Sequence, residues 1–218
     1  HITTFNSRIK YNGKIISDKE LLAFFTRLKE VLLLCDMGIN YHQLSFFCSC
    51  MLMNIIQPEW FILEVGIGGR LDPSNVFNAE ISILTLAGLD HIDILGGTIE
   101  SIGLEKAHIA RPNKPIILGD KMPLAVIKYL NKHQAIIKYA HLPIIYDDAL
   151  LPEISLACAL EACTSISSHY KHDILIPEDL CNLQLPGRIQ LLSDNPIIIV
   201  DVAHNIDAVK YLFSVIKK

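Results

Sequence analysis

Two candidate cation-binding side chains follow apolar segments that have the pattern of buried strands. Glu64 lies near the end of the apolar run 61–65, just before three glycines, and His91 stands between two aspartates after the apolar run 81–86. The carboxyl ends of parallel strands meet at one edge of a sheet, where ligands gather. A carboxylate and an imidazole there could bind a divalent cation or a phosphate-bearing ligand. Taken alone, each residue also fits an ordinary surface role, as a solvated or turn-capping glutamate and a loop histidine.

Three further polar residues occupy positions that suit a phosphorylated ligand. Lys106 lies near the end of a predicted helix at 98–108, where a cation ordinarily complements the helix dipole. Beside a bound cation, an uncharged lysine amine could instead be carbamylated. Arg188 follows a proline and a glycine, and a guanidinium at such a junction could hold a phosphate between two domains. Asp201 follows the apolar run 197–200 and could accept hydrogen bonds from a ribose or a base. An interdomain salt bridge is the structural alternative for this last cluster.

The composition excludes several classes of protein. Nineteen Lys and Arg against 23 Asp and Glu give a formal charge of −4, which argues against nucleic acid binding along a basic face. With 51% apolar and 19% charged residues, the chain has the composition of a folded globular protein. The six cysteines form no CxxC pair, so we expect free, mostly buried thiols in a reducing cytoplasm. The longest uncharged stretch, 37–58, carries many polar groups and is predicted as a buried helix, with no membrane span.

The spacing of the apolar residues predicts alternating strands and helices. Ser17 to Glu20 has the form of a capping box, and the apolar positions after it predict a helix that runs to about Leu34. Strands that alternate with helices are typical of an α/β fold whose mostly parallel sheet is covered on both faces. We expect further helices at 44–56, 98–108, 122–131, 152–167 and 205–218, and strands at 61–65, 81–86, 115–118, 189–192 and 197–200.

The chain is expected to hold one domain and the start of another. Its 218 residues exceed one average domain and fall short of two, and they end inside an apolar, helix-like segment. The stretch 176–187 has the proline and glycine content of a linker, so we place a domain boundary near Pro186. Residues 1–185 would form one domain, and 186–218 the first strand–strand–helix of a second. We interpret the chain as a piece of a larger protein.

Five motifs together resemble the folylpolyglutamate synthase and dihydrofolate synthase family, within the Mur-type ATP-dependent amide ligases. They are LEVGIGGRLDPSN at 63–75, LDH at 89–91, EKA at 105–107, LPGR at 185–188 and DVAHN at 201–205. The first and the last are long and specific, their order is that of the family, and the resemblance covers nearly the whole chain. It implies a Mur-ligase-like central ATP-binding domain, followed by the start of a Rossmann-like glutamate-ligase domain.

The resemblance also implies a reaction and its ligands. In that family ATP activates pteroate or a folate as an acyl phosphate, and the amino group of glutamate then displaces phosphate to form an amide. Glu64 and His91 would be Mg²⁺ ligands, and Lys106 the carbamylated lysine that supports a second cation. Arg188 and Asp201 would contact ATP.

Further site residues follow from the same resemblance. His204 would lie near the nucleotide or the transferring phosphate and, with Lys106, is a candidate catalytic residue. The expected small molecules are ATP, L-glutamate and dihydropteroate or a folate, with no nucleic acid or membrane partner, and the family is usually monomeric and cytoplasmic. The positions at the pterin substrate are Ser45, Phe46, Phe47, Cys48, Leu71, Asp72 and Pro73.

The sequence also departs from the family pattern. The glycine-rich loop that cradles phosphates and ends in Lys-Ser or Lys-Thr is expected before a segment like 1–17, and these 218 residues do not contain it. Cys48 stands where the family usually has a glutamate, and Ser155 where an ATP-contacting asparagine is expected. His108 replaces a glycine and Ile206 a proline. The second domain, which should hold glutamate, stops after its first helix.

Three hypotheses follow. The first is an ATP-dependent ligase that joins L-glutamate to dihydropteroate or a (poly)glutamylated folate, present here as a fragment and inactive alone. The second is a non-catalytic remnant with at most weak nucleotide or pterin binding, and the third is a Mur-type ligase for a different acid. Because a truncated second domain leaves an apolar face uncovered, we also expect poor solubility or self-association.

Overall fold

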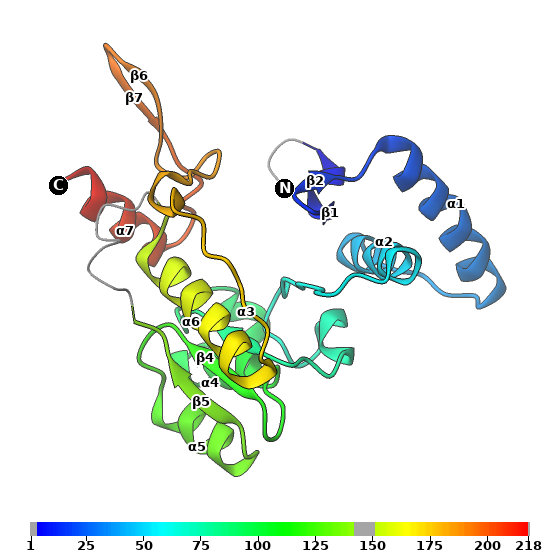
Figure 1. The fold of residues 1–218 in the computed structure, drawn as a ribbon, viewed down its shortest axis with the longest axis horizontal. Helices are drawn as coiled ribbons and strands as arrows, with labels where there is room; N and C mark the ends of the chain where they lie inside the picture. Colours follow the sequence, from blue (N-terminus) through cyan, green and yellow to red (C-terminus); the bar gives the residue numbers. More distant parts are fainter. Residues whose placement is uncertain (1–3, 142–150, 218) are drawn as a thin grey trace. The chain divides into compact units, whose positions relative to one another are not determined.

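The computed structural model describes residues 4–141 and 151–217 (Figure 1). The chain separates into two compact units. The first unit consists of His1–Gly66 and Asp72–Val76, and the second of Ile67–Leu71 and Phe77–Lys218.

The first unit is built around two capped helices. α1 (Asp18–Leu34) begins with the expected capping box, in which the Ser17 side chain accepts a hydrogen bond from the Glu20 backbone and the Ser17 N–H donates to the Glu20 carboxylate at 2.9 Å. α2 (Tyr41–Ile56) begins earlier than expected because a second capping box precedes it. The smaller elements of this unit are η1 (Phe5–Arg8), the antiparallel strands β1 (Lys10–Tyr11) and β2 (Lys14–Ile15), and η2 (Pro73–Val76).

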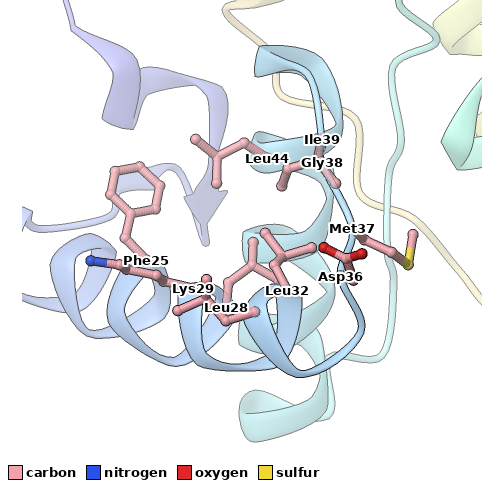
Figure 2. A pocket seen from close by; sticks show the side chains of 10 residues that line it. Phe25, Leu28, Lys29, Leu32, Asp36, Met37, Gly38, Ile39 and Leu44 are labelled. Carbon is pink, nitrogen blue, oxygen red and sulfur yellow. The ribbon is translucent and has the colours of Figure 1, made fainter.

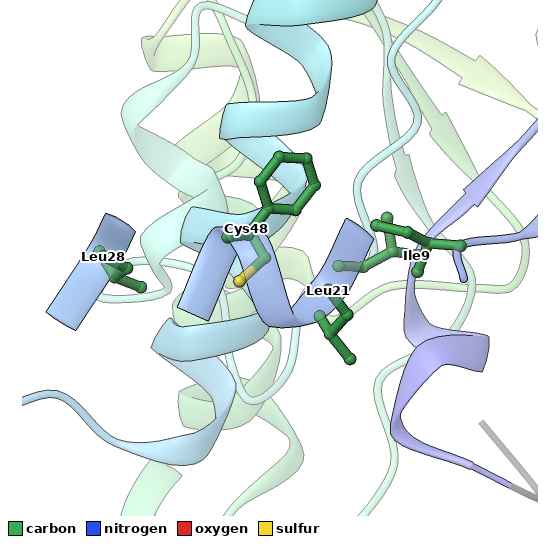
Figure 3. Packing of buried hydrophobic residues seen from close by; sticks show 6 residues of the cluster. Ile9, Leu21, Leu28 and Cys48 are labelled. Atoms are coloured by element: carbon green, nitrogen blue, oxygen red, sulfur yellow. The ribbon is translucent and has the colours of Figure 1, made fainter. Parts of the chain in front are cut away.

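A small apolar core joins the two helices (Figure 3). The buried positions of α1 recur every three or four residues, which gives the helix one apolar face. Cys48 of α2 packs against that face and is wholly buried, and this burial raises the pKa of its thiol to about 11. The buried members of the core are Ile9, Ile16, Leu21, Phe24, Leu28 and Cys48.

The second half of α1 is less completely covered. An open groove of about 410 Å³ runs between this part of α1 and the turn that leads into α2 (Figure 2). Its lining is mostly apolar, with the charged side chains of Lys29 and Asp36. Beyond the core, Leu33 and Leu34 at the end of α1 are 71% and 87% exposed.

The second unit contains the expected parallel sheet. Its three strands lie in the order β3 (Ser82–Leu84), β4 (Pro115–Leu118), β5 (Ile136–Tyr139), all parallel. Every residue of the central strand β4 is buried, so both of its faces are covered. The α/β fold class is therefore confirmed.

Helices pack closely on this sheet. α4 (Ile99–Ala107) and α5 (Leu124–Lys132) supply Ala107, Val126 and Leu130 to one core with the strands, and α6 (Glu153–Tyr170) contacts β4. The close packing depends on glycine where α6 meets the end of β4. A Cβ atom on Gly119 would come within 2.8 Å of the Cys158 sulfur.

An arginine closes the carboxyl end of α4. Arg111 Nη1 donates to the carbonyl oxygens of His108, Ile109 and Ala110 at 3.1–3.3 Å, and its Nη2 donates to the Phe77 carbonyl oxygen at 2.6 Å. These three carbonyl groups lie in the turn that follows α4. A single guanidinium therefore connects this turn to the chain that leads into β3.

The carboxyl-terminal part of the second unit is a hairpin and a helix. β6 (Gln190–Asp194) and β7 (Ile197–Val200) are antiparallel, with an irregularity in β6, and α7 (Ile206–Ile216) follows. These elements agree with the strand–strand–helix expected there. The domain boundary placed near Pro186 stays a prediction. The short helices of this unit are α3 (Ile92–Leu95) and η4 (Leu180–Asn182).

One expected strand is absent, and one observed strand was not predicted. The run 61–65 forms no strand, and its Ile62 is 93% exposed. A strand requires a hydrogen-bonded neighbour, and none of the sheets in the described residues includes this segment. β5 was not predicted, because its two isoleucines are followed by a lysine and a tyrosine, which obscures the apolar pattern. Part of the neighbouring stretch 137–151, where the pattern weakens, lies outside the described residues.

The cysteine thiols and the lengths of the helices bear on two further expectations. Cys35, Cys48, Cys50, Cys158 and Cys163 are free, as expected, although Cys35 is exposed. Over the described residues, every helix is too short or too polar to cross a membrane.

Candidate active site

Asp90 lies at the centre of a polar cluster in the second unit. Its Oδ2 accepts a hydrogen bond from Asn205 Nδ2 at 3.0 Å, and its Oδ1 accepts one from the His91 backbone at 2.9 Å. The Nε2 atoms of His91 and His204 each lie 4.0 Å from one of the two carboxylate oxygens. The fold therefore brings two predicted site residues, His91 and His204, to opposite oxygens of the same carboxylate.

The electrostatics keep this carboxylate charged. Burial alone would raise the pKa of Asp90, but the hydrogen bonds from Asn205 and His91 and the nearby imidazoles of His91 and His204 hold it below its ordinary value. An anionic oxygen pair flanked by two imidazoles can orient the rings toward an anionic ligand.

The local backbone explains how the two loops meet. His91 has a left-handed conformation, with φ of 51°, at the residue before α3, which turns the chain sharply after β3. A Cβ atom on Gly88 would lie 2.5 Å from the Asp207 carboxylate in the first turn of α7. Asn205 caps α7 by accepting a hydrogen bond from the Ala208 backbone at 2.9 Å, so the same side chain fixes α7 and binds Asp90.

Both carboxylate oxygens of Asp201 accept hydrogen bonds from nearby backbone N–H groups. Its Oδ2 accepts a hydrogen bond from the Ile189 backbone at 2.8 Å, and its Oδ1 accepts one from the Ala203 backbone at 2.7 Å. These bonds connect the end of β7 to the start of β6, and they are neither the interdomain salt bridge nor the nucleotide contact considered from the sequence. The preceding Arg188 is exposed. ATP contacts by Arg188 and Asp201 stay predictions.

The glycines of the LEVGIGGR motif serve packing in this structure. A Cβ atom on Gly69 would lie 3.0 Å from the Glu105 and Lys106 carbonyl oxygens. A Cβ atom on Gly68, whose φ is +67°, would lie 2.8 Å from a Leu95 methyl group. The loop Ile67–Leu71 can therefore approach the end of α4 only because glycine has no side chain.

An ion pair fastens this loop to α4. Arg70 Nη2 lies 2.9 Å from Glu105 Oε1, and its Nε donates to both carboxylate oxygens at 3.0 and 3.1 Å. The hydrogen bonds and the charge of Glu105 raise the pKa of Arg70. The pair lies in an open cavity of about 400 Å³ that is also lined by Ser101 and His108. The neighbouring Lys106 is partly buried, and its carbamylation stays a prediction.

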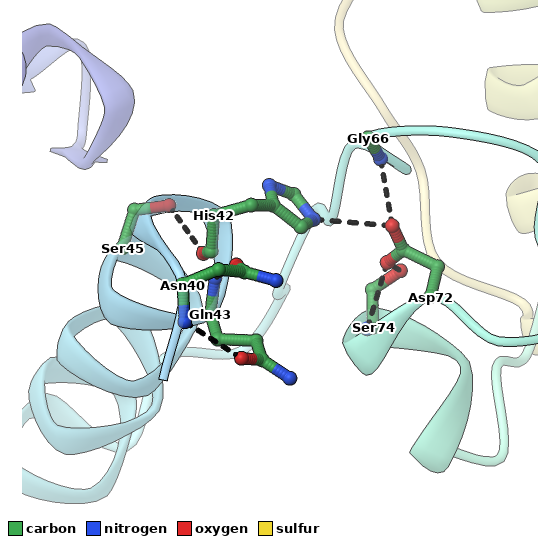
Figure 4. A network of polar contacts seen from close by, with 7 residues as sticks. All are labelled: Asn40, His42, Gln43, Ser45, Gly66, Asp72 and Ser74. Carbon is green, nitrogen blue, oxygen red and sulfur yellow. Dashed lines mark hydrogen bonds and ion pairs between the residues drawn. The ribbon is translucent and has the colours of Figure 1, made fainter. Parts of the chain in front are cut away.

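Asp72 forms the second polar cluster, in the first unit (Figure 4). Its Oδ1 accepts hydrogen bonds from the backbone and the hydroxyl of Ser74, at 2.9 and 2.5 Å, and its Oδ2 accepts one from the Gly66 backbone at 2.8 Å. His42 Nε2 lies 3.1 Å from the same Oδ2. Burial alone would raise the pKa of Asp72, but these hydrogen bonds and the charge of His42 outweigh it and lower the pKa.

His42 was not predicted as a site residue. It lies 30 positions before Asp72, and no motif in the sequence connects the two. Nearby on α2, Ser45 is buried, and its hydroxyl donates to the His42 carbonyl oxygen at 2.8 Å. Phe46 is also buried, Phe47 is partly buried, and Cys48 lies in the apolar core. Their substrate contacts stay predictions, as do those of Leu71, Asp72 and Pro73.

The expected pairing of Glu64 with His91 is not tested by the fold. Glu64 is exposed and belongs to the first unit, whereas His91 is exposed and belongs to the second. The argument that both residues follow strands of one sheet was wrong, because 61–65 is not a strand. Within the described ranges, no group of three or more His, Cys, Asp or Glu side chains is arranged to hold a metal ion. Ser155 is exposed on α6.

Comparison with solved structures identifies the class of the fold. Its parallel sheet flanked by helices is that of the Mur-ligase-like α/β class. The FolC protein of Escherichia coli, solved in complex with DHPP and ADP, superimposes with a TM-score of 0.87 at 28% identity over 100% of this chain and 56% of that one. The bifunctional synthase of Yersinia pestis, complexed with AMPPNP and Mn, gives a TM-score of 0.83 at 27% identity over 100% of this chain and 57% of that one.

Sequence comparison then gives the family. The dihydrofolate synthase/folylpolyglutamate synthase of E. coli is 30% identical over 232 residues, which are 97% of this chain and 54% of that protein. The enzyme of the same name from Buchnera aphidicola subsp. Acyrthosiphon pisum is 31% identical over 97% of this chain and 56% of its own length. No family model matches the chain. The resemblance is confirmed: this chain is a homologue of the folylpolyglutamate and dihydrofolate synthases and spans about half the length of the relatives it matches.

Proposed function

We propose that this chain carries part of an ATP-dependent ligase that joins L-glutamate to dihydropteroate or to a (poly)glutamylated folate. Activation of the acid would proceed through an acyl phosphate, which the glutamate amine would attack with release of phosphate. The observation that supports this most directly is the match of the whole chain to a homologue solved with DHPP and ADP. With only about half of that protein covered, we propose that this chain alone is inactive as a ligase.

The side chains fit a divalent cation in part. Carboxylate oxygens are preferred by Mg²⁺, whereas imidazole is a less common ligand for it. Glu64 is an exposed carboxylate, and Asp90, held anionic beside His91, offers further oxygen atoms. Glu64, His91 and Lys106 are proposed to hold the cations. When bound, Mg²⁺ would neutralise phosphate charge.

Other side chains of this chain would position the ligands. Asn205 would keep Asp90 fixed between the two imidazoles, since it is bonded to both Asp90 and α7. His204 would then face the phosphate that is transferred, and its ring is 70% exposed and can reach a ligand. Arg188 would contribute a positive charge toward the nucleotide. The dominant contributions would be positioning and electrostatic stabilisation.

Titration calorimetry with Mg-ADP tests the nucleotide site. We expect binding by the parent chain, and at least about tenfold weaker binding by Glu64→Gln and His91→Ala if these residues support the cation. Glu100→Gln and His141→Ala alter exposed residues of the same types and serve as matched controls. Parent-like binding by Glu64→Gln and His91→Ala would contradict the metal assignment.

A non-catalytic remnant is the second candidate. It is favoured by Asp201, whose two carboxylate oxygens are both bonded to the backbone of its own loop. This candidate predicts that Mg-ADP binds weakly and that ATP is not turned over when dihydropteroate and glutamate are added. Mg-ADP binding by the purified chain with a micromolar dissociation constant would exclude it.

A further inference from the structure

The Asp72 carboxylate is enclosed by its own unit. Its side chain is 2% exposed, and four protein donors surround it: the Gly66 N–H, the Ser74 N–H, the Ser74 hydroxyl and His42 Nε2. A carboxylate has about four lone-pair positions for hydrogen bonds. The acceptor capacity of Asp72 is therefore already used within the chain.

His42 differs from the other donors. The Gly66 and Ser74 groups belong to the same turn as Asp72, whereas His42 reaches across from the first turn of α2 (Figure 4). Its side chain is 37% exposed. A Cβ atom on Gly66 would come within 2.8 Å of the imidazole, so the ring lies directly over the turn. Because a carboxylate accepts only, the His42 Nε2 must carry the hydrogen of this bond.

We propose that His42 is an internal ligand of Asp72, which a substrate ring must displace in order to reach the carboxylate. This inference rests on the proposed function and on the predicted contact of Asp72 with the acceptor substrate. The ligand class that fits is a flat heterocycle with an N–H or amino donor on its edge, because displacement of His42 frees one acceptor position, on Asp72 Oδ2. The dihydropteroate ring has this arrangement.

The physical consequence is a specificity device. A ligand without a donor cannot replace the His42 hydrogen bond, whereas a ring that places an N–H at the vacated position of Asp72 Oδ2 can. In the parent chain, part of the binding free energy of the ring is used to move His42 away. His42 is therefore a positioning residue whose removal should strengthen binding of the ring, opposite to the loss expected from removing a direct substrate contact.

The test compares two replacements of His42. His42→Phe keeps a flat ring of similar size and removes the N–H donor, and His42→Gln keeps an N–H donor that can reach Asp72. Dihydropteroate binding is measured by calorimetry for the parent and both variants, with thermal unfolding as the check on folding. We expect His42→Phe to bind about tenfold more tightly than the parent, because one hydrogen bond to a charged group is no longer lost on binding. His42→Gln should bind like the parent.

A second readout requires no change to the site. In the parent chain labelled with ¹⁵N-histidine, the His42 Nε2 signal, assigned by its loss in His42→Phe, should show a hydrogen-bonded N–H. It should move toward the position of a solvated ring as dihydropteroate is added. An unchanged His42 signal at saturating dihydropteroate would overturn the proposal. So would equal or weaker binding by His42→Phe, or absence of binding by every variant. Mg-ADP titration of the same samples tells such a failure apart from a failure of the proposed function.

Discussion

Two apolar strands of the second unit have almost the same kind of sequence and opposite environments. β4 reads Pro-Ile-Ile-Leu and has no exposed residue, and its Ile116, Ile117 and Leu118 are 0% exposed. β7 reads Ile-Ile-Ile-Val, yet Ile197 is 73% exposed and Ile198 45%. β4 has a parallel neighbour on each side and helices against it, whereas β7, within the described part of the chain, pairs only with β6. Apolar content thus predicts a strand, and the neighbours of that strand determine its burial.

The region of β6, β7 and α7 is connected by polar bonds more than by apolar packing. Asp201 joins the two ends of the hairpin, and Asn205 joins α7 to Asp90. The β4 region shows the reverse, with a closed apolar core. We therefore expect substitutions of apolar side chains to be costly around β4 and mild in the hairpin.

The largest difference is expected between two isoleucines. Ile117→Ala should lower the free energy of unfolding by about 2–5 kcal/mol, because it removes a fully buried side chain and leaves a cavity. Ile197→Ala should change it by less than about 0.5 kcal/mol, because the side chain is mostly exposed. Urea unfolding of both variants measures the two values. A cost at Ile197 equal to that at Ile117 would show that β7 is buried in solution.

The second effect concerns space beside β4. Gly119→Ala should destabilise the chain by about 1–3 kcal/mol, since the new methyl group would meet the Thr85 carbonyl oxygen and the Cys158 sulfur. Gly97→Ala is the control, because no atom lies within 4 Å of the position of its Cβ. Thermal unfolding compares them. If both substitutions are equally mild, the contact between α6 and the end of β4 is looser than described.

A third, smaller effect is expected in the hairpin. Asp201→Ala removes the acceptor of the Ile189 and Ala203 N–H groups and should cost about 1–2 kcal/mol. The loss should be local, so hydrogen exchange at these two amides should accelerate while the amides of β4 remain protected. Asp194→Ala, which alters an exposed carboxylate at the end of β6, should leave both sets unchanged. Faster exchange throughout β4 would mean that the hairpin and the sheet unfold together.

The smallest effect on stability is expected from Ile197→Lys, which should leave the unfolding free energy almost unchanged. It should nevertheless reduce self-association, because it interrupts the exposed apolar surface of the hairpin. Analytical ultracentrifugation measures this change, with Ser193→Lys as a variant that adds the same charge and retains every apolar side chain. A parent chain that is monomeric at high concentration would contradict the expected association.

The elements that the sequence predicts best are those whose signals are local. The capping box at Ser17 and the apolar spacing after it placed α1 accurately, and the runs at 81–86 and 115–118 predicted two strands of the sheet. The run 61–65 is also mostly apolar, although it contains Glu64, and it forms no strand. The absence of a strand at 61–65 has the same cause as the exposure of β7, because strand pairing depends on residues far away in the chain.

The candidate site was predictable to a similar extent. The motifs identified His91 and His204, which the fold brings to one carboxylate. They gave no indication of the contact between His42 and Asp72 or of the bonds that occupy Asp201. Such contacts join residues that are distant in sequence, and a side chain of ordinary type at an ordinary position carries no sign of its partner.

The guanidinium of Arg111 has a consequence for motion. This single planar cation donates hydrogen bonds to four carbonyl oxygens, three in the turn that follows α4 and one at Phe77. Fraying of that helix end would have to release the chain ahead of β3 in the same event, so the two segments are expected to open together. A lysine in this place could not span both, since its ammonium is a compact point of charge on a flexible stem.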